Sequence, residues 1–332
     1  MFTMWNIERQ IQQGLIDGAV VLAGNLERDL YSGAWGYADK ANHVPMTEDS
    51  VFDIASITKA VGTNSVLLAA LTDGILELDR PFIDYLPEFT GKPPRPVTIR
   101  ELALHISGVN INYCNEGSSE EMHRKILAVD FPHQPGTVYQ YTCTNYILLG
   151  FLLEKLYTRD LAEIATERVF RPLRMTASAW TRPPAGSLSR TVRTINAAPG
   201  VISDPGARHY APRPFGNAGI FTTAADLAKY ARMLLRNDGT IFPKKITRLC
   251  FTDFNPPGIH HPHSIGWDMM PDMIPDGLSG QTIFHNGWTG QTLWIDPGSQ
   301  RFVIVLTNRM KEWDRAKYGR KAIAEELLSL LK

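Results

Sequence analysis

Ser56 and Lys59, a serine and a lysine three positions apart, form the first pattern in the sequence that could do chemistry. They stand where a strand-like segment gives way to a helical pattern, and positions i and i+3 of a helix share one face. The lysine amine can therefore lie beside the serine hydroxyl and, when neutral, accept its proton. A chain of this size contains roughly one such spacing by chance, so an N-capping serine followed by a solvent-exposed lysine is the alternative.

Tyr141 is a second candidate, because it lies just before a helical run that opens near Asn145. A tyrosine hydroxyl close to a lysine ammonium loses its proton more easily, and it could then act as a general base or acid. The alternative is a core-lining aromatic residue that precedes a helix.

A third segment, His285-Asn286-Gly287-Trp288, begins on a predicted strand. Its glycine would let a ligand approach the strand backbone closely. The Trp288 backbone N–H could then join that of Ser56, at a helix N-terminus, as a two-donor oxyanion hole. Taken alone, His285 is more often a structural histidine.

The composition is that of an ordinary globular protein. Of 332 residues, 44% are apolar and 20% are charged, which excludes wholesale disorder. The length is that of about two domains. Because 34 basic side chains balance 34 acidic ones, bulk electrostatic binding to nucleic acid or to an anionic membrane is not expected.

Cysteine usage and the first residues give expectations about location. Cys114, Cys143 and Cys250 are odd in number and form no C-x-x-C pair, so neither a disulfide framework nor a zinc ribbon is expected. Cys114 and Cys250 are expected to be ordinary thiols. The first residues lack the basic and apolar regions of a secretory signal, and no apolar run is long enough to span a membrane. The expected location is the cytoplasm.

Strand patterns near both ends of the chain enclose a mostly helical middle. A first helix from Trp5 is expected to close at Gly18, and a last one covers 314–331. The segments predicted as strands are 19–24, 30–37, 264–270, 281–285, 291–296 and 302–308. We predict an α/β sheet domain made of residues 1–75 and 181–332, interrupted by a helical domain of residues 76–180.

In order and spacing, these motifs resemble those of the serine β-lactamase-related family. Tyr141 lies 85 residues and His285 lies 229 residues after Ser56. Further segments similar to family signatures are 33–39, 76–79, 85–89, 98–102, 105–108, 216–224, 226–228 and 306–309. The resemblance covers residues 18–310. It implies a β-lactamase/transpeptidase-like α/β (α+β) fold, in which the active site lies between an antiparallel sheet flanked by helices and a mostly helical domain.

The family includes class C β-lactamases, D-alanyl-D-alanine carboxypeptidases, esterases of the β-lactamase type and a few acyltransferases. The resemblance implies that Ser56 is the acylated nucleophile, Lys59 its partner base and Tyr141 the proton shuttle. Residues 285–287 stand where the lactamases have K-T-G, and the Trp288 N–H matches the second oxyanion donor.

Two departures from the family pattern bear on the substrate. Cys143 occupies the asparagine place of Y-x-N, so the carboxamide that helps orient the lysine and the substrate's amide is missing. His285 in place of lysine removes a permanent charge that would attract a carboxylate. Cys143, Asn286 and Gly287 are expected to contact the substrate, and both departures favour less charged esters or amides.

Two other interpretations of the motifs are weaker. A cluster of histidine and aspartate side chains suggests a metal site, but its segment is loop-like and fits no standard ligand spacing. These residues are His260, His261, His263, Asp268 and Asp272. Cys143 acting as nucleophile with His285 as base would leave the spacing of Ser56 and Lys59 unexplained. No metal or cofactor is therefore expected.

The function predicted from the sequence is a serine acyl hydrolase that cleaves small esters or amides through an acyl-Ser56 intermediate. The enzymatic alternative is a D-amino-acid-type peptidase, such as a DD-carboxypeptidase, or a weak β-lactamase. A non-catalytic binding or sensor domain is the alternative from another class, although the complete set of Ser56, Lys59 and Tyr141 argues against it. The expected partner is a small-molecule substrate, with no nucleic acid or membrane; the oligomeric state is not predicted.

Overall fold

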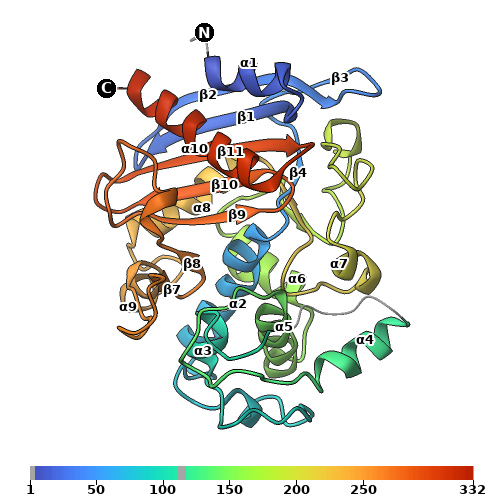
Figure 1. The fold of residues 1–332 in the computed structure, drawn as a ribbon, viewed down its shortest axis with the longest axis vertical. Helices are drawn as coiled ribbons and strands as arrows, with labels where there is room; N and C mark the ends of the chain where they lie inside the picture. Colours follow the sequence, from blue (N-terminus) through green and yellow to red (C-terminus); the bar gives the residue numbers. More distant parts are fainter. Residues whose placement is uncertain (1–3, 111–116, 332) are drawn as a thin grey trace.

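A large antiparallel sheet forms the upper part of the molecule in the computed structural model (Figure 1), which describes residues 4–110 and 117–331. Cys114 lies outside the described residues. The sheet has eight strands in the order β3-β2-β1-β11-β10-β9-β8-β7. They are β1 (Ile16–Asn25), β2 (Asp29–Asp39), β3 (Val44–Pro45), β7 (His263–Ser264), β8 (Trp267–Asp268), β9 (Ile283–Gly287), β10 (Gln291–Asp296) and β11 (Arg301–Arg309).

The two ends of the chain meet at the centre of this sheet. β1 pairs antiparallel with β11, so that Val21 lies opposite Val305. Side chains alternate between the two faces of β1: Val21 belongs to one buried apolar cluster, while Val20 and Leu22 belong to another. Because both faces of the sheet are covered, the central strands are apolar at nearly every position.

Helices cover the two faces of the sheet. On the outer face lie α1 (Trp5–Gln12) and α10 (Trp313–Leu330), whose ends are marked N and C in Figure 1. On the other face α8 (Ala224–Arg236) contacts β1, β10 and β11. The remaining helices are α2 (Asn64–Thr72), α3 (Ile99–Ala103), α4 (Ser119–Ile126), α5 (Cys143–Tyr157), α6 (Leu161–Ala165), α7 (Pro205–Tyr210) and α9 (Lys244–Thr247).

A three-stranded sheet connects the large sheet to the helical part. Its order is β4 (Phe52–Asp53), β6 (Ile220–Thr222) and β5 (Ala179–Trp180), with both pairings antiparallel. β4 leads directly into the segment that carries Ser56. The mixture of helices with an antiparallel sheet agrees with the predicted fold class, whereas the domain boundaries at residues 76 and 181 stay a prediction.

Two expected elements differ from the structure. The first helix ends at Gln12 rather than Gly18, because Gly14, with φ +64°, turns the chain, and Gly18 already lies in β1. At Gly18 a Cβ would come within 2.6 Å of the Trp35 carbonyl oxygen. The single strand expected at 264–270 is instead the hairpin of β7 and β8, which turns at Gly266 with φ +89°.

Within residues 4–110 and 117–331, no helix is both long enough and apolar enough to cross a bilayer.

Candidate active site

Ser56 lies at a sharp turn that joins β4 to the following helical segment. Ala55, immediately before it, has φ +45°, a left-handed conformation that a non-glycine residue keeps only where surrounding contacts hold it. The buried carboxylate of Asp53 provides such a contact by accepting a hydrogen bond from the Ala55 N–H at 2.9 Å. It also accepts the Ser203 N–H at 2.7 Å. Asp53 therefore fixes the turn that presents the Ser56 hydroxyl.

Lys59 is fully buried at the start of a π-helical segment, Lys59–Thr63. Its Nζ donates to Ser56 Oγ at 3.0 Å, to the Asn217 carbonyl oxygen at 3.2 Å and to Cys143 Sγ at 3.6 Å. An ammonium group has three N–H donors, so these three acceptors can satisfy all of them. The contact between Ser56 and Lys59 that the spacing predicts is thus present.

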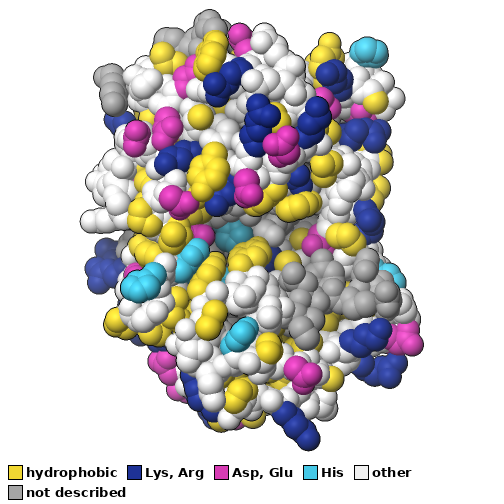
Figure 2. Space-filling view, in the orientation of Figure 1, with side chains coloured by type: hydrophobic (Ala, Val, Ile, Leu, Met, Phe, Trp, Pro, Cys, Tyr) yellow, Lys and Arg dark blue, Asp and Glu magenta, His cyan; other side chains and the backbone are white. Residues whose placement is uncertain are grey.

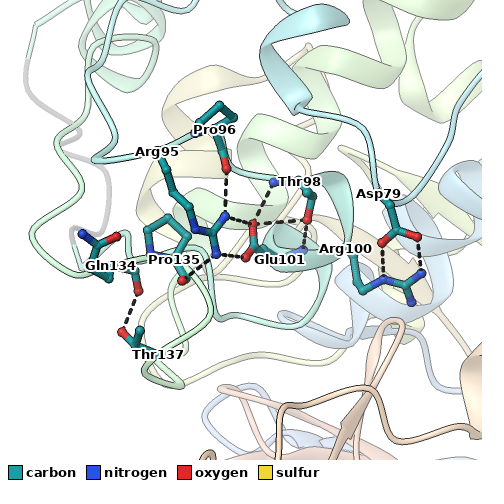
Figure 3. A network of polar contacts seen from close by, with 9 residues as sticks. All are labelled: Asp79, Arg95, Pro96, Thr98, Arg100, Glu101, Gln134, Pro135 and Thr137. Carbon is teal, nitrogen blue, oxygen red and sulfur yellow. Dashed lines mark hydrogen bonds and ion pairs between the residues drawn. The ribbon is translucent and has the colours of Figure 1, made fainter.

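Tyr141 is carried by a strap, residues 135–142, that is tied to α3 and its neighbours (Figure 3). Arg95 pairs with Glu101 at 2.5 Å and donates to the Pro135 carbonyl oxygen at 2.7 Å. Farther along, the His105 carbonyl oxygen accepts a backbone N–H of the strap at 2.8 Å. These bonds hold the extended strap against the helical part and fix the position of Tyr141.

The Tyr141 side chain spans the space between the serine–lysine pair and two histidines. Its ring centroid lies 5.0 Å from Lys59 Nζ, 4.6 Å from the His105 ring and 6.4 Å from the His285 ring. The hydroxyl interacts with Lys59 and Ser56, while 40% of the residue stays exposed. Tyr141 can therefore exchange a proton with either group and still reach a bound substrate.

Lys59 and Tyr141 titrate as an interacting pair. Burial lowers the pKa of Lys59, but Cys143 and Tyr141 outweigh burial, and the net displacement of this pKa is upward. Burial raises the pKa of Tyr141, and Lys59 offsets this only in part. The pair therefore holds an ammonium and a phenol at neutral pH, which differs from the neutral lysine expected from the sequence. The species that accepts the Ser56 proton is therefore the Lys59–Tyr141 pair in the form that has already lost one of its two protons.

This protonation state predicts an alkaline pH profile. Because both pKa values are raised, the reactive form is a minority that grows with pH, and kcat/KM should rise about tenfold per pH unit between pH 6 and pH 8. Initial rates with p-nitrophenyl acetate, corrected for spontaneous hydrolysis with the Ser56→Ala variant, would measure it. A flat profile, or a maximum below pH 7, would contradict this assignment.

Trp288 lies just past β9, in the turn toward β10, and lines the same two cavities as Ser56. Gly287 has no room for a side chain, because a Cβ would come within 2.6 Å of the Ile54 carbonyl oxygen. The sequence suggested ligand approach at this glycine, but its close neighbour is the protein's own backbone before Ser56. Arg309 holds the turn by donating to the Trp288 carbonyl oxygen at 2.7 Å.

The oxyanion hole formed by the Ser56 and Trp288 N–H groups stays a prediction, with which the hydrogen bonding of both groups is compatible. In the part of the chain that the structure describes, neither the Ser56 N–H nor the Trp288 N–H donates to a protein acceptor. Two unengaged N–H groups beside a nucleophile match what a tetrahedral intermediate requires.

His285 and Asn286 line the same cavity as Ser56. Burial and the nearby Lys59 together lower the pKa of His285 to about 3, so this imidazole is neutral at physiological pH. The Asn286 Oδ1 atom is already engaged, because it accepts hydrogen bonds from Thr292 Oγ1 at 2.7 Å and from Arg320 at 3.4 Å. The β9 motif thus offers the cavity polar but uncharged groups.

Two cavities meet at the nucleophile. The first, of about 470 Å³, lies on the His285 side, and the second, of about 450 Å³, lies on the side of Cys143 and Asp204. Ser56, Tyr141 and Trp288 belong to the walls of both. A bond cleaved at Ser56 can therefore have one substrate portion in each cavity.

Of the residues considered for a metal site, His261 and Asp268 contact each other, while His263 and Asp272 contact other groups of the protein. His261 lies 3.3 Å from Asp268, and His263 Nδ1 lies 2.7 Å from the Ser264 carbonyl oxygen. Asp272 accepts a hydrogen bond from the Tyr318 hydroxyl at 3.1 Å. Among the described residues, no group of three or more histidine, cysteine or acidic side chains is arranged to hold a metal ion.

Several site residues were not identified from the sequence as part of the site. The Asn217 carbonyl oxygen contacts Lys59, and the Asn217 amide donates to Asp204 at 3.1 Å in the second cavity. Trp313 and Lys317 enter the first cavity from α10. Asn217 lies within the family-like segment 216–224, which was a usable signal, whereas nothing local marks Trp313 or Lys317.

Known proteins resemble this chain over nearly its whole length. The model of the family described as Beta-lactamase matches residues 6–328. The chain belongs to the beta-lactamase family. This confirms both the family resemblance and the predicted fold class, and it makes the protein a serine β-lactamase-family hydrolase.

Relatives within this family carry different names. The chain is 26% identical to the N-acetylmuramyl-L-alanine amidase of Bacillus subtilis (strain 168), over 91% of this chain and 79% of that protein. It is 24% identical to the "Putative D-alanyl-D-alanine carboxypeptidase" of Escherichia coli (strain K12), over 84% of this chain and 75% of that protein.

Solved structures share the fold at lower sequence identity. EstCE1, described as a hydrolase with promiscuous acyltransferase activity, has a TM-score of 0.80 at 19% identity and covers 97% of this chain and 96% of its own. The selenomethionyl derivative of unliganded simvastatin synthase (LovD) from Aspergillus terreus has a TM-score of 0.79 at 17% identity and covers 98% of this chain and 96% of its own. At these identities the likeness shows the fold alone.

Proposed function

We propose that this beta-lactamase-family protein is a serine acyl hydrolase that cleaves small, weakly charged esters or amides through an acyl-Ser56 intermediate. The observation that carries the proposal is the contact of 3.0 Å between Lys59 Nζ and Ser56 Oγ, with Tyr141 beside both. A hydroxyl held against a proton-accepting pair is the arrangement that nucleophilic catalysis requires.

The proposed reaction has two stages. Ser56 Oγ attacks the substrate carbonyl carbon as its proton passes to the Lys59–Tyr141 pair, and the N–H groups of Ser56 and Trp288 stabilise the oxyanion. The carbonyl then re-forms as the bond to the leaving group breaks, and the pair returns the proton to that group. Water then attacks the carbonyl carbon of the acyl-Ser56 ester as Tyr141 takes its proton. The bond to Ser56 Oγ breaks, Tyr141 returns the proton to Ser56 Oγ, and the acid is released.

A comparison of substrates tests this proposal. Steady-state kcat/KM would be measured for short p-nitrophenyl esters, nitrocefin and D-alanyl dipeptides, with Ser56→Ala as the blank. We expect the esters to be hydrolysed fastest, because the neutral His285 offers no positive charge to a substrate carboxylate. Nitrocefin hydrolysis far faster than ester hydrolysis would overturn the preference for esters.

Cys143 gives a further prediction about the substrate. In the Cys143→Asn variant a carboxamide replaces the thiol next to Lys59 and restores an amide-binding group. We expect the ratio of activity on amide-bearing β-lactams to activity on esters to rise. Parallel assays of nitrocefin and p-nitrophenyl acetate would measure this ratio, and Cys143→Ser is the matched control without a carboxamide. An unchanged or lower ratio would contradict the role given to this position.

A second candidate, a D-amino-acid-type peptidase, is favoured by Lys317. This side chain of α10 lines the same cavity as His285 and brings a positive charge that could pair with a substrate's terminal carboxylate. If the peptidase is the true activity, Lys317→Met should raise KM for D-alanyl dipeptides about tenfold and leave neutral esters unaffected. Equal effects on both substrate types would remove this support.

A further inference from the structure

The first cavity beside Ser56 is walled mainly by rings. Figure 2 shows hydrophobic and histidine side chains gathered around the hollow between the upper and lower parts of the molecule. Only Ser56, Asn286, Asp268 and Lys317 among the lining residues lack a ring. The ring-bearing lining residues are Tyr139, Tyr141, His261, His263, His285, Trp288 and Trp313.

These rings form two groups that come from different parts of the fold. On the strap side, Tyr139 stacks on His261 with a centroid distance of 3.6 Å and an interplanar angle of 11°, and His263 lies 5.7 Å from Tyr139. On the sheet side, Trp288 stacks on Trp313 of α10 at 5.2 Å and 25°. Each group is held in a fixed orientation by its own stacking, so the cavity presents preformed flat surfaces.

The wall carries charges of both signs. Burial lowers the pKa of His263 to about 4, so this imidazole is neutral at physiological pH. Burial raises the pKa of Asp268, but the contact with His261 at 3.3 Å helps to displace it downward, so Asp268 is a carboxylate of the wall and Lys317 is its cation. Flat ring surfaces without an excess of either charge favour a planar apolar ligand over a charged or highly solvated one.

We propose that the first cavity binds an aromatic ring system of the substrate, so that the natural substrate is an aryl-containing ester or amide. The chemistry of this inference rests on the proposed hydrolase function, but the binding itself does not. Ring faces and edges exposed by the two stacked groups can pair with an inserted ring in offset or edge-to-face geometry, which a saturated ring of the same size cannot do. The volume of about 470 Å³ lies within the range of small-ligand sites.

Binding to a protein that cannot react separates this inference from the hydrolase proposal. We would titrate the Ser56→Ala variant by calorimetry with 2-naphthol and with its fully hydrogenated counterpart, decahydro-2-naphthol. We expect the aromatic probe to bind about tenfold more tightly than the saturated one. Adding Tyr139→Leu or Trp313→Leu should reduce this ratio to about two.

Tyr318→Leu is the matched control, because Tyr318 is an exposed aromatic residue on the same helix as Trp313 but outside the cavity. It should leave the ratio unchanged. Far-UV circular dichroism and melting curves would establish that each variant folds. The two leucine substitutions lie on different elements, so one variant is sufficient for the test if the other does not fold. Equal affinities for the two probes, no binding of either, or a ratio insensitive to both leucine variants would overturn the inference. Failure of Ser56 to acylate would instead refute the hydrolase proposal.

Discussion

Lys59→Met is expected to lower kcat/KM for ester hydrolysis on the order of 10⁴-fold, the loss that follows removal of one member of a nucleophile–base unit. Lys59 Nζ is the group that contacts Ser56 Oγ at 3.0 Å, and methionine fills a similar volume without a proton acceptor. KM should change little, because the side chain lies beneath the nucleophile rather than in a cavity wall.

The same variant should stay folded, with a Tm close to that of the wild type. Lys59 is fully buried, so methionine removes the desolvation cost of an ammonium, but it also removes the interactions with Cys143 and Tyr141 that displace the Lys59 pKa upward. Because these two effects oppose each other, we expect Tm to change little while activity falls. Lys155→Met, which removes an exposed lysine paired with Glu88 at 2.7 Å, is the control and should keep full activity. A loss of both activity and Tm would indicate that Lys59 serves mainly to hold the fold.

Tyr141→Phe is expected to lower kcat about 10³-fold, within the range typical of a positioned general acid–base. The substitution removes only the hydroxyl that interacts with Lys59 and Ser56, and it keeps the ring beside His105. Because the same hydroxyl is assigned to deacylation, acyl-enzyme should accumulate in this variant and appear as a burst of the first product.

Stopped-flow measurement of p-nitrophenol release would resolve that burst. Tyr157→Phe is the matched control, since it deletes a hydroxyl that donates to Asp73 at 2.7 Å on the surface. It should keep wild-type kinetics. A Tyr141→Phe enzyme with more than a tenth of wild-type kcat would show that Lys59 alone handles the proton.

The fold was predictable where burial imposes a clear pattern. β1 and β11 are covered on both faces, and their continuous apolar runs identified them as strands. At Gly18 the sequence alone was misleading, because this glycine is required by the close Trp35 carbonyl of the neighbouring strand rather than by a helix end. Gly266 similarly turns a hairpin where one strand was expected.

The candidate site likewise has one part that the sequence predicts and another part that it does not. The contact between Ser56 and Lys59 is local, so spacing along a helix predicted it. Asn217 reaches Lys59 across 158 positions of sequence, and its contact uses a backbone carbonyl that any residue could supply. The upward displacement of the Lys59 pKa likewise depends on Cys143 and Tyr141, whose closeness in space only the fold reveals.

The position of Trp313 and Lys317 at the first cavity also depends on the fold rather than on a local sequence pattern. α10 is amphipathic, and its sequence indicates a helix packed on a sheet but not which end approaches Ser56. That end is set by the pairing of β1 with β11 and by the short turn that follows β11. Substrate-facing residues on such terminal elements are therefore the part of the site that sequence patterns predict least well.

Covalent labelling tests the central claim, that Ser56 is the acylated nucleophile, most directly. The full chain would be treated with an alkyl fluorophosphonate, and its intact mass measured before peptide mapping. We predict a single adduct of one phosphonyl group on the peptide that contains Ser56, no adduct on Ser56→Ala, and strongly slowed labelling of Lys59→Met. A wild-type protein that stays unlabelled, or one labelled at Cys143 or elsewhere, would contradict the account.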